Sequence, residues 1–91
     1  MQAKPLKGIR VVEMGSSVAG PYGAWILAEL GAEVIKVEDP RTGDASRHWG
    51  PLNANGNSAM FETMNNGKKS IAVDLADEKE ASALRKLILD S

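Results

Sequence analysis

The chain has 91 residues and a formal net charge of −1 at pH 7, with one histidine and no cysteine. Eleven basic residues against twelve acidic ones create no net positive field that would attract nucleic acid or an anionic membrane surface. Without cysteine, a disulfide framework, a thiolate zinc site and a cysteine nucleophile are all excluded.

The length allows one domain at most, since domains typically run to roughly 100–150 residues. No apolar run approaches the roughly 18 residues that a membrane span needs. The start, Met1–Pro5, is followed by no apolar stretch that could serve as a signal peptide. We therefore predict a soluble, cytoplasmic, single-domain protein.

The first half of the chain predicts a βαβ unit. Residues Ile9–Met14 are short, β-branched and bounded by glycines, which indicates a strand. Helical spacing of apolar residues follows over Pro21–Leu30, with proline in the first turn and Gly31 after the last. Glu33–Glu38 is a second strand, and a strand–helix–strand succession implies that the two strands are parallel with a right-handed crossover.

The second half begins with a long loop, predicted over about residues 39–69 and holding one helical turn around Ser58–Met64. Loops of this length in a compact domain are usually functional or disordered. A third strand is predicted over Ser70–Leu75. Asp77 followed by Glu80 resembles a capping box and predicts the start of a final helix.

The predicted fold class is therefore α/β: a Rossmann-like parallel half-sheet (βαβ, long loop, β, α) that is incomplete. Parallel sheets are normally covered on both faces and have more strands than three. We expect the chain to be the front portion of a longer design. Three strands cannot cover every apolar helical residue, so we also predict self-association through the set Ile26, Leu27, Leu84 and Ile88.

Ligands of open parallel sheets bind outside the carboxyl ends of the strands. The small, glycine-rich segment Gly15–Gly23 leads there into a helix N-terminus, where backbone N–H groups could receive an anion or a carbonyl oxygen. The alternative is structural, because any tight strand-to-helix turn favours small residues. Both interpretations stay open at this point.

Two nucleotide motifs are incomplete. Glu38 stands where a Rossmann domain places its ribose-binding acid, but the glycine spacing is not the dinucleotide fingerprint. The segment Asn66–Ser70 resembles the end of a phosphate loop, yet Glu62 occupies the position of the loop's first glycine. A phosphate loop also follows a strand, whereas this segment precedes one. Its two lysines, Lys68 and Lys69, are predicted to be a solvated pair, with a phosphate contact as the alternative.

The remaining polar residues of the loop suggest no complete catalytic set. His48 is alone, so it can form neither a metal cage nor a catalytic triad, and a loop contact is the favoured interpretation. Asp44 and Arg47 lie three residues apart and could form a local ion pair, which would contribute little stability if it is exposed. No pair of carboxylates suggests a nucleophile and an acid.

Seven short motifs follow one another along essentially the whole chain. They are Pro5–Glu13, Ala19–Tyr22, Leu30–Glu38, Gly43–Asp44 with Arg47, Trp49–Pro51, Asn65 with Gly67–Ile71, and Asp74–Leu75. Each motif alone is weak. Taken together and in register, they make the sequence resemble the class III CoA-transferases (the CaiB/BaiF family), which include formyl-CoA transferase, carnitine CoA-transferase and α-methylacyl-CoA racemase.

The resemblance implies a half-domain that binds coenzyme A, within an interlocked homodimer whose substrates are an acyl-CoA and a small carboxylic acid. Two backbone positions would face the thioester end of CoA, and four residues after the third strand would line its adenine end. Asp39 departs from formyl-CoA transferase, which has a nucleotide-contacting arginine there. The six implied binding residues are Val18, Ala19, Val73, Asp74, Leu75 and Ala76.

The resemblance also implies an aspartate nucleophile that lies downstream of all 91 residues. We therefore predict no catalytic residue and no metal ligand in this chain, and no turnover by the chain alone. The leading hypothesis is a CoA-transferase segment that contributes part of the CoA site. The alternatives are a racemase of 2-methylacyl-CoA, a non-catalytic CoA-binding or assembly fragment, and, on the βαβ unit and Glu38 alone, a nicotinamide-dinucleotide domain.

Overall fold

The computed structural model describes residues 4–50, 52–54 and 56–91. Residues 1–3, from the start examined for a signal peptide, and Pro51 of the Trp49–Pro51 motif lie outside the described residues. The described chain contains three strands, three α-helices and one short 3₁₀ helix. All of the elements predicted from the sequence are present, with ends that differ by a few residues.

The three strands form one parallel sheet in the order β1–β2–β3, which confirms the predicted α/β half-sheet. β1 spans Arg10–Glu13, β2 spans Glu33–Glu38 and β3 spans Lys69–Ala72. The central strand β2 pairs with both neighbours and is buried on both faces from its second residue onward. Because the strands are parallel, their carboxyl ends meet at one edge of the sheet.

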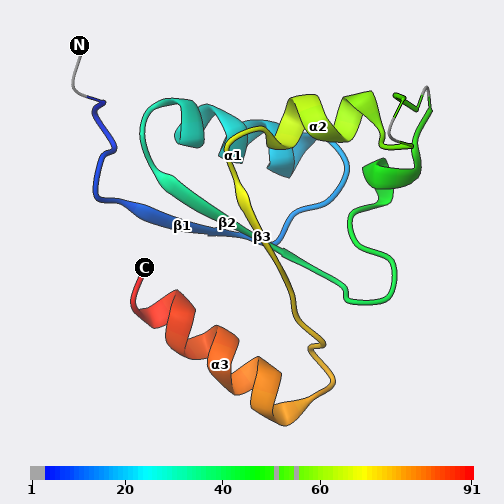
Figure 1. Ribbon diagram of the computed structural model, residues 1–91. Coiled ribbons are helices and arrows are strands. Elements are labelled where there is room, and N and C mark those ends of the chain that lie inside the picture. Colours follow the sequence, from blue (N-terminus) through cyan, green and yellow to red (C-terminus); the bar gives the residue numbers. More distant parts are fainter. Residues whose placement is uncertain (1–3, 51, 55) are drawn as a thin grey trace.

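Helices cover the two faces of the sheet unequally (Figure 1). α1 (Ala19–Glu29) and α2 (Ala59–Asn65) lie side by side over one face, and α3 (Glu78–Leu89) lies on the opposite face. The apolar core is on the first face and centres on Ala24, Ala32 and Val34. Each strand is followed by a loop that leads into a helix, and these three loops lie along the edge where β1, β2 and β3 end.

The segment predicted as a long loop is more ordered than expected. It contains the 3₁₀ helix η1 (Ala45–His48) and a seven-residue helix α2, longer than the single predicted turn. Asp44 caps η1 by accepting from the Ser46 N–H, and Ser58 caps α2 by accepting from the Phe61 N–H. Both helices are too short for apolar periodicity to reveal, and their capping residues are also the usual residues of turns.

The start of α3 follows half of the predicted capping box. The Asp77 carboxylate accepts from the N–H groups of Lys79 and Glu80, as an N-cap does. The reciprocal contact is not formed, because the Glu80 carboxylate faces the Asp74 N–H at 3.4 Å. The Asp77 N–H donates instead to the Asp74 carbonyl. Two acidic residues thereby brace the turn between β3 and α3.

Apolar side chains on the helices are covered in part. Leu84 is buried and Leu27 packs against the core, whereas Ile26 and Ile88 are exposed. Two of the four residues are therefore available for the predicted self-association, which stays a prediction.

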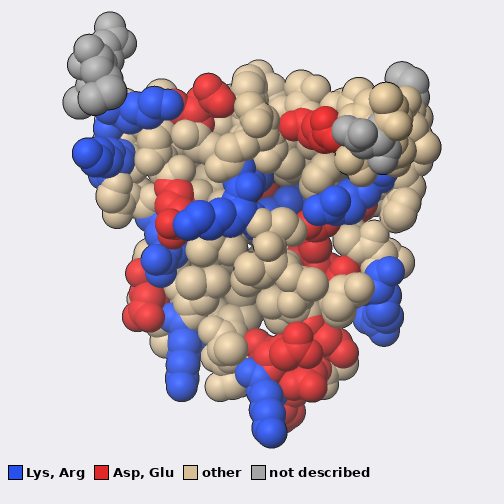
Figure 2. Space-filling view, in the orientation of Figure 1, with Lys and Arg blue, Asp and Glu red and all other residues tan. Residues whose placement is uncertain are grey.

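On the face shown in Figure 2, basic and acidic side chains alternate, and acidic groups gather over the first turn of α3. None of the described helices combines the length and the apolar character needed to cross a bilayer.

Gly31 ends α1 in the left-handed conformation that the sequence predicts, with φ +106°. A Cβ there would lie 2.5 Å from the Cβ of Lys4 and 3.2 Å from the backbone nitrogen of Lys7. We expect Gly31→Ala to lower the free energy of unfolding by about 1–3 kcal/mol, measured by urea denaturation. The matched control is Gly23→Ala inside α1, where a Cβ meets nothing within 4 Å. This control should stabilise by about 0.5–1 kcal/mol, and equal effects of the two changes would contradict the account.

Candidate functional site

A cavity of about 230 Å³ lies at the edge of the sheet where the strands end. Its lining comes from the end of β2 and from the segments that follow β1, β2 and β3. Four consecutive residues after β3 form one side of it, and these are the residues that the resemblance assigns to the adenine end of CoA. They are Val73, Asp74, Leu75 and Ala76.

The other side of this cavity combines apolar and charged groups. Met14 and Val37 are apolar lining residues, and Glu38 and Asp39 are acidic ones. Arg41 is the one basic residue among the lining residues, and its side chain is 74% exposed. Its guanidinium contacts the Asp39 carboxylate, with Nη2 3.1 Å from Oδ2, and this hydrogen bonding lowers the pKa of Asp39.

The loop between β3 and α3 is held by its own backbone and by one side chain. The Val73 N–H donates to the Glu38 carbonyl, which extends the pairing of β2 and β3 beyond the last strand residue. The Asp74 carboxylate accepts from the Ala76 N–H at 2.9 Å, so Asp74 is occupied in shaping the turn. Leu75 is left exposed at the cavity rim, where an apolar or aromatic ring could stack against it.

Val18 and Ala19, the other two implied binding residues, are at the start of α1 and do not line this cavity. Both are exposed. Val18 is the N-cap of α1. Its side chain forms no hydrogen bond with the N–H groups of the first helical turn. The structure therefore separates the six implied residues into two groups along the same edge of the sheet.

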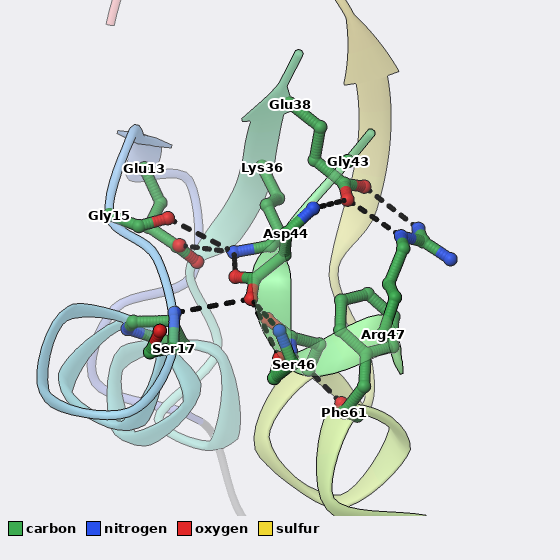
Figure 3. A network of polar contacts seen from close by, with 12 residues as sticks. Glu13, Gly15, Ser17, Lys36, Glu38, Gly43, Asp44, Ser46, Arg47 and Phe61 are labelled. Atoms are coloured by element: carbon green, nitrogen blue, oxygen red, sulfur yellow. Dashed lines mark hydrogen bonds and ion pairs between the residues drawn. The ribbon is translucent and has the colours of Figure 1, made fainter. Parts of the chain in front are cut away.

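A buried network of charges lies beneath these loops (Figure 3). At its centre is Lys36 of β2, which is 1% exposed. Its Nζ is 2.7 Å from Oε2 of Glu13 on β1 and 2.8 Å from Oδ2 of Asp44. Burial opposes the charged form of Lys36, but hydrogen bonds with Asp44 and Glu13 outweigh it and raise the pKa of the ammonium. Lys68 contacts the second oxygen of Glu13, so cations and carboxylates alternate.

Glu38 at the end of β2 forms a second, adjoining ion pair. Arg47 contacts both oxygens of its carboxylate, at 2.6 and 2.8 Å, and packs its guanidinium 4.0 Å from the centre of the Phe61 ring. Hydrogen bonds from Arg47, Ser70 and the Asp44 N–H lower the pKa of Glu38 to about 2, against the opposing effect of burial. This carboxylate has no free oxygen for a ribose, which argues against the nicotinamide-dinucleotide hypothesis.

Two predicted interactions are wrong. Asp44 and Arg47 do not pair with each other, because Asp44 pairs with Lys36 and Arg47 with Glu38. Lys68 is neither solvated nor free for a phosphate, since its ammonium contacts Glu13, the Pro21 carbonyl and the Asn65 side chain. Burial is the main cause of its lowered pKa. Only Lys69 is a surface group, paired with Glu33.

Sequence inspection missed the network because its members are far apart along the chain. One signal was present: the pattern Glu-Val-Ile-Lys-Val-Glu places charges inside a strand that must be central in a three-stranded sheet. A buried charge of this kind requires a partner. The strand register then places Glu13 directly opposite Lys36.

The histidine takes no part in these contacts with charged groups. His48 Nε2 lies 3.1 Å from the Thr42 carbonyl at an exposed position, which agrees with the predicted loop contact. Within residues 4–50, 52–54 and 56–91, no group of three or more His, Cys, Asp or Glu side chains is arranged to hold a metal ion.

Comparison with known proteins decides the family. Residues 6–91 match CoA-transferase family III. The chain belongs to this family. The match begins just before β1 and includes the whole described sheet, the cavity and the buried network.

Relatives and solved structures of CoA-transferase family III agree with this assignment. The chain is 44% identical over 84 residues to the mouse succinyl-CoA:glutarate CoA-transferase, covering 92% of this chain and 19% of that protein. It is 36% identical to the acetyl-CoA:oxalate CoA-transferase of Acetobacter aceti, covering 92% of this chain and 21% of the relative. A CAIB/BAIF family protein from Brucella suis superimposes with a TM-score of 0.89 at 40% identity, covering 99% of this chain and 25% of that structure. The chain thus spans about a fifth of the length of the curated relatives that it matches.

Proposed function

We propose that this chain provides part of the coenzyme A site of a CoA-transferase, which moves CoA from an acyl-CoA thioester to a free carboxylic acid. The single observation that carries the proposal is the cavity at the carboxyl edge of the sheet. Val73–Ala76 form one side of it, and they are the residues implied for the adenine end of CoA. Family membership supports the same ligand class.

In this proposal the two groups of implied residues receive the two ends of CoA. The adenosine lies in the cavity, where exposed Leu75 offers apolar surface to the base. Arg41 is the cation at the cavity rim and receives a phosphate, taking over from the arginine that Asp39 replaces. The acyl-pantetheine end runs toward Val18 and Ala19, where uncapped N–H groups of α1 face a carbonyl oxygen.

The transferase is favoured over the racemase because the mouse and Acetobacter aceti relatives are both named CoA-transferases. The nucleophile of the transfer matches no position of this chain. We therefore propose that the chain binds CoA without turning it over, and that the acyl donor and acceptor are selected by parts of the protein that these 91 residues do not include.

The first test of ligand class is a native mass spectrum of the chain with CoA and NAD supplied together at equal concentration. Retention of CoA alone would support the proposal. Retention of NAD alone, or of neither by a folded chain, would contradict it.

A second test concerns Arg41, which we expect to bind a phosphate through its guanidinium. Arg41→Met should lower the affinity for CoA about tenfold, measured by titration calorimetry, because a charge-assisted hydrogen bond to an anion contributes on the order of 1.5–3 kcal/mol. Affinity for dephospho-CoA should fall less if the 3′-phosphate is the group that is bound. Arg10→Met, at the opposite edge of the sheet, is the matched control and should leave both affinities unchanged. Equal losses in the two variants would contradict the assignment.

A further inference from the structure

One buried ion pair contacts two residues of the segment that joins β1 to α1 (Figure 3). Lys36 Nζ lies 3.3 Å from the Gly15 carbonyl, and the Ser17 N–H donates to Asp44 Oδ1 at 3.1 Å. Lys36 and Asp44 are themselves paired at 2.8 Å, with each side chain 1% exposed. Segment Gly15–Ser17 is therefore held at two points by the buried side chains of Lys36 and Asp44.

Ser17 has an unusual backbone conformation. Its φ is +69°, and it is the one non-glycine residue with positive φ in the described part of the chain. This left-handed conformation costs free energy for an L-residue, so it persists where the surroundings enforce it. The bond from the Ser17 N–H to the buried Asp44 carboxylate is such a constraint.

Asp44 is well placed to impose this constraint. Its own N–H is bound by Glu38 at 2.8 Å, and its Oδ1 also accepts from the N–H and the hydroxyl of Ser46, at 2.8 and 2.7 Å. Gly43 before it has φ +67°, and a Cβ there would lie 2.9 Å from both Glu38 Oε1 and Arg47 Cδ. The position of the carboxylate is thus set by β2 and η1, independently of the loop that it holds.

We propose that Asp44, with Lys36, is a positioning residue that holds Ser17 in its left-handed conformation and so sets the direction of the Val18–Ala19 backbone. The inference rests on the proposed function, in which this backbone faces the acyl end of CoA. Asp44 touches no substrate in this account. It acts through Ser17, and through Ser17 on the start of α1.

The test compares two ligands that reach different distances along the site. Acetyl-CoA extends to Val18–Ala19, whereas adenosine 3′,5′-bisphosphate represents the nucleotide end alone. We expect Asp44→Asn to weaken acetyl-CoA binding at least tenfold while the affinity for adenosine 3′,5′-bisphosphate stays within about twofold, measured by calorimetry. A general loss of structure would weaken both ligands, and equal losses would overturn the proposal. Asp90→Asn, the same chemical change at the exposed end of α3, is the matched control.

A rescue variant tests the backbone conformation directly. Glycine adopts positive φ readily, so Ser17→Gly should restore most of the acetyl-CoA affinity that Asp44→Asn removes. Failure of this rescue in a folded double variant would overturn the proposal. Ser17→Val provides an independent arm if Asp44→Asn does not fold, because a β-branched residue opposes positive φ while the charge network is unchanged. It should lose acetyl-CoA affinity, and unchanged affinity would overturn the proposal.

An NMR measurement separates this inference from the proposed function. A strong intraresidue NOE between the Ser17 amide and α protons reports positive φ without any ligand. Loss of that NOE in Asp44→Asn supports the positioning role even if the chain binds no CoA, in which case only the proposed function fails. Retention of the NOE in the folded variant would overturn the positioning role whether or not CoA binds.

Discussion

Lys36→Met is expected to be the most destabilising single change in the chain, lowering the free energy of unfolding by about 3–5 kcal/mol. The lysine is 1% exposed and lies between Glu13 and Asp44. Removing its charge leaves two carboxylates buried near each other with one cation fewer, and the methionine side chain cannot hydrogen-bond to either. Small domains are stable by only about 5–15 kcal/mol, so this variant should be largely unfolded or close to it. Urea denaturation followed by circular dichroism measures the loss.

Lys69→Met is the matched control for this prediction. It removes the same charge from the neighbouring strand β3, but the Lys69 side chain is 70% exposed and its partner Glu33 is a surface group. Surface pairs contribute roughly 0–1 kcal/mol, so the control should unfold almost as the wild type does. A Lys36→Met variant within 1 kcal/mol of Lys69→Met would contradict the structural role given to the buried network.

Acid should destabilise the chain through Glu38 and Asp44. The folded state lowers the pKa of Glu38 from 4.5 to about 2 and that of Asp44 from 3.8 to about 2. For Asp44, burial acts against this shift, and the hydrogen bonds from Lys36, Ser46 and Ser17 outweigh it. A carboxylate whose folded pKa is lowered contributes stability that is present above its unfolded pKa and lost as the pH falls through the folded pKa. We expect this loss as the pH falls from about 4.5 to about 2.

The size of this effect follows from the two shifts. Each pKa unit corresponds to about 1.4 kcal/mol, so Glu38 contributes on the order of 3 kcal/mol and Asp44 on the order of 2 kcal/mol. Urea denaturation at pH 7, 5, 4 and 3 measures the profile. Glu38→Gln should be less stable than the wild type at pH 7 and should lose much of the acid dependence, whereas Glu33→Gln, at a surface pair, should keep it. A wild-type stability that is flat between pH 5 and pH 3 would be incompatible with the ion pairs described.

The fold could be predicted from the sequence where local signals, such as turn residues and apolar periodicity, agree with the element that the folded chain forms. Glycine after α1 and apolar periodicity within it specified this helix, and β-branched runs specified β1 and β2. Tertiary structure determined the rest. α2 is stable because Ser58 caps it and Arg47 packs on Phe61, and neither contact is visible as a pattern.

The pairing of charges was harder to predict than the strands. Asp44 and Arg47 are near each other in the sequence, and proximity alone suggested that they pair. The structure shows that each pairs with a residue of β2, because the end of this central strand carries Lys36 and Glu38 on the face toward η1. Predicting this requires the strand register, which follows from the assembled sheet.

Val73–Ala76, four of the six implied binding residues, line one cavity, and their role at the adenine end of CoA stays a prediction. Val18 and Ala19 lie apart from it at the start of α1. A ligand that contacts both groups must extend along the carboxyl edge of the sheet, and a long, flexible molecule such as CoA has the shape to do so. A compact ligand would reach only one group.

The most direct test of a CoA site along this edge is chemical-shift mapping of the ¹⁵N-labelled chain during a titration with acetyl-CoA. We expect shifts at the amides of Val73–Ala76 and of Val18 and Ala19, with none at Gly8 or Gly31 near the opposite edge of the sheet. Shifts confined to that opposite edge, or a folded chain whose spectrum does not change at saturating acetyl-CoA, would contradict the proposed site.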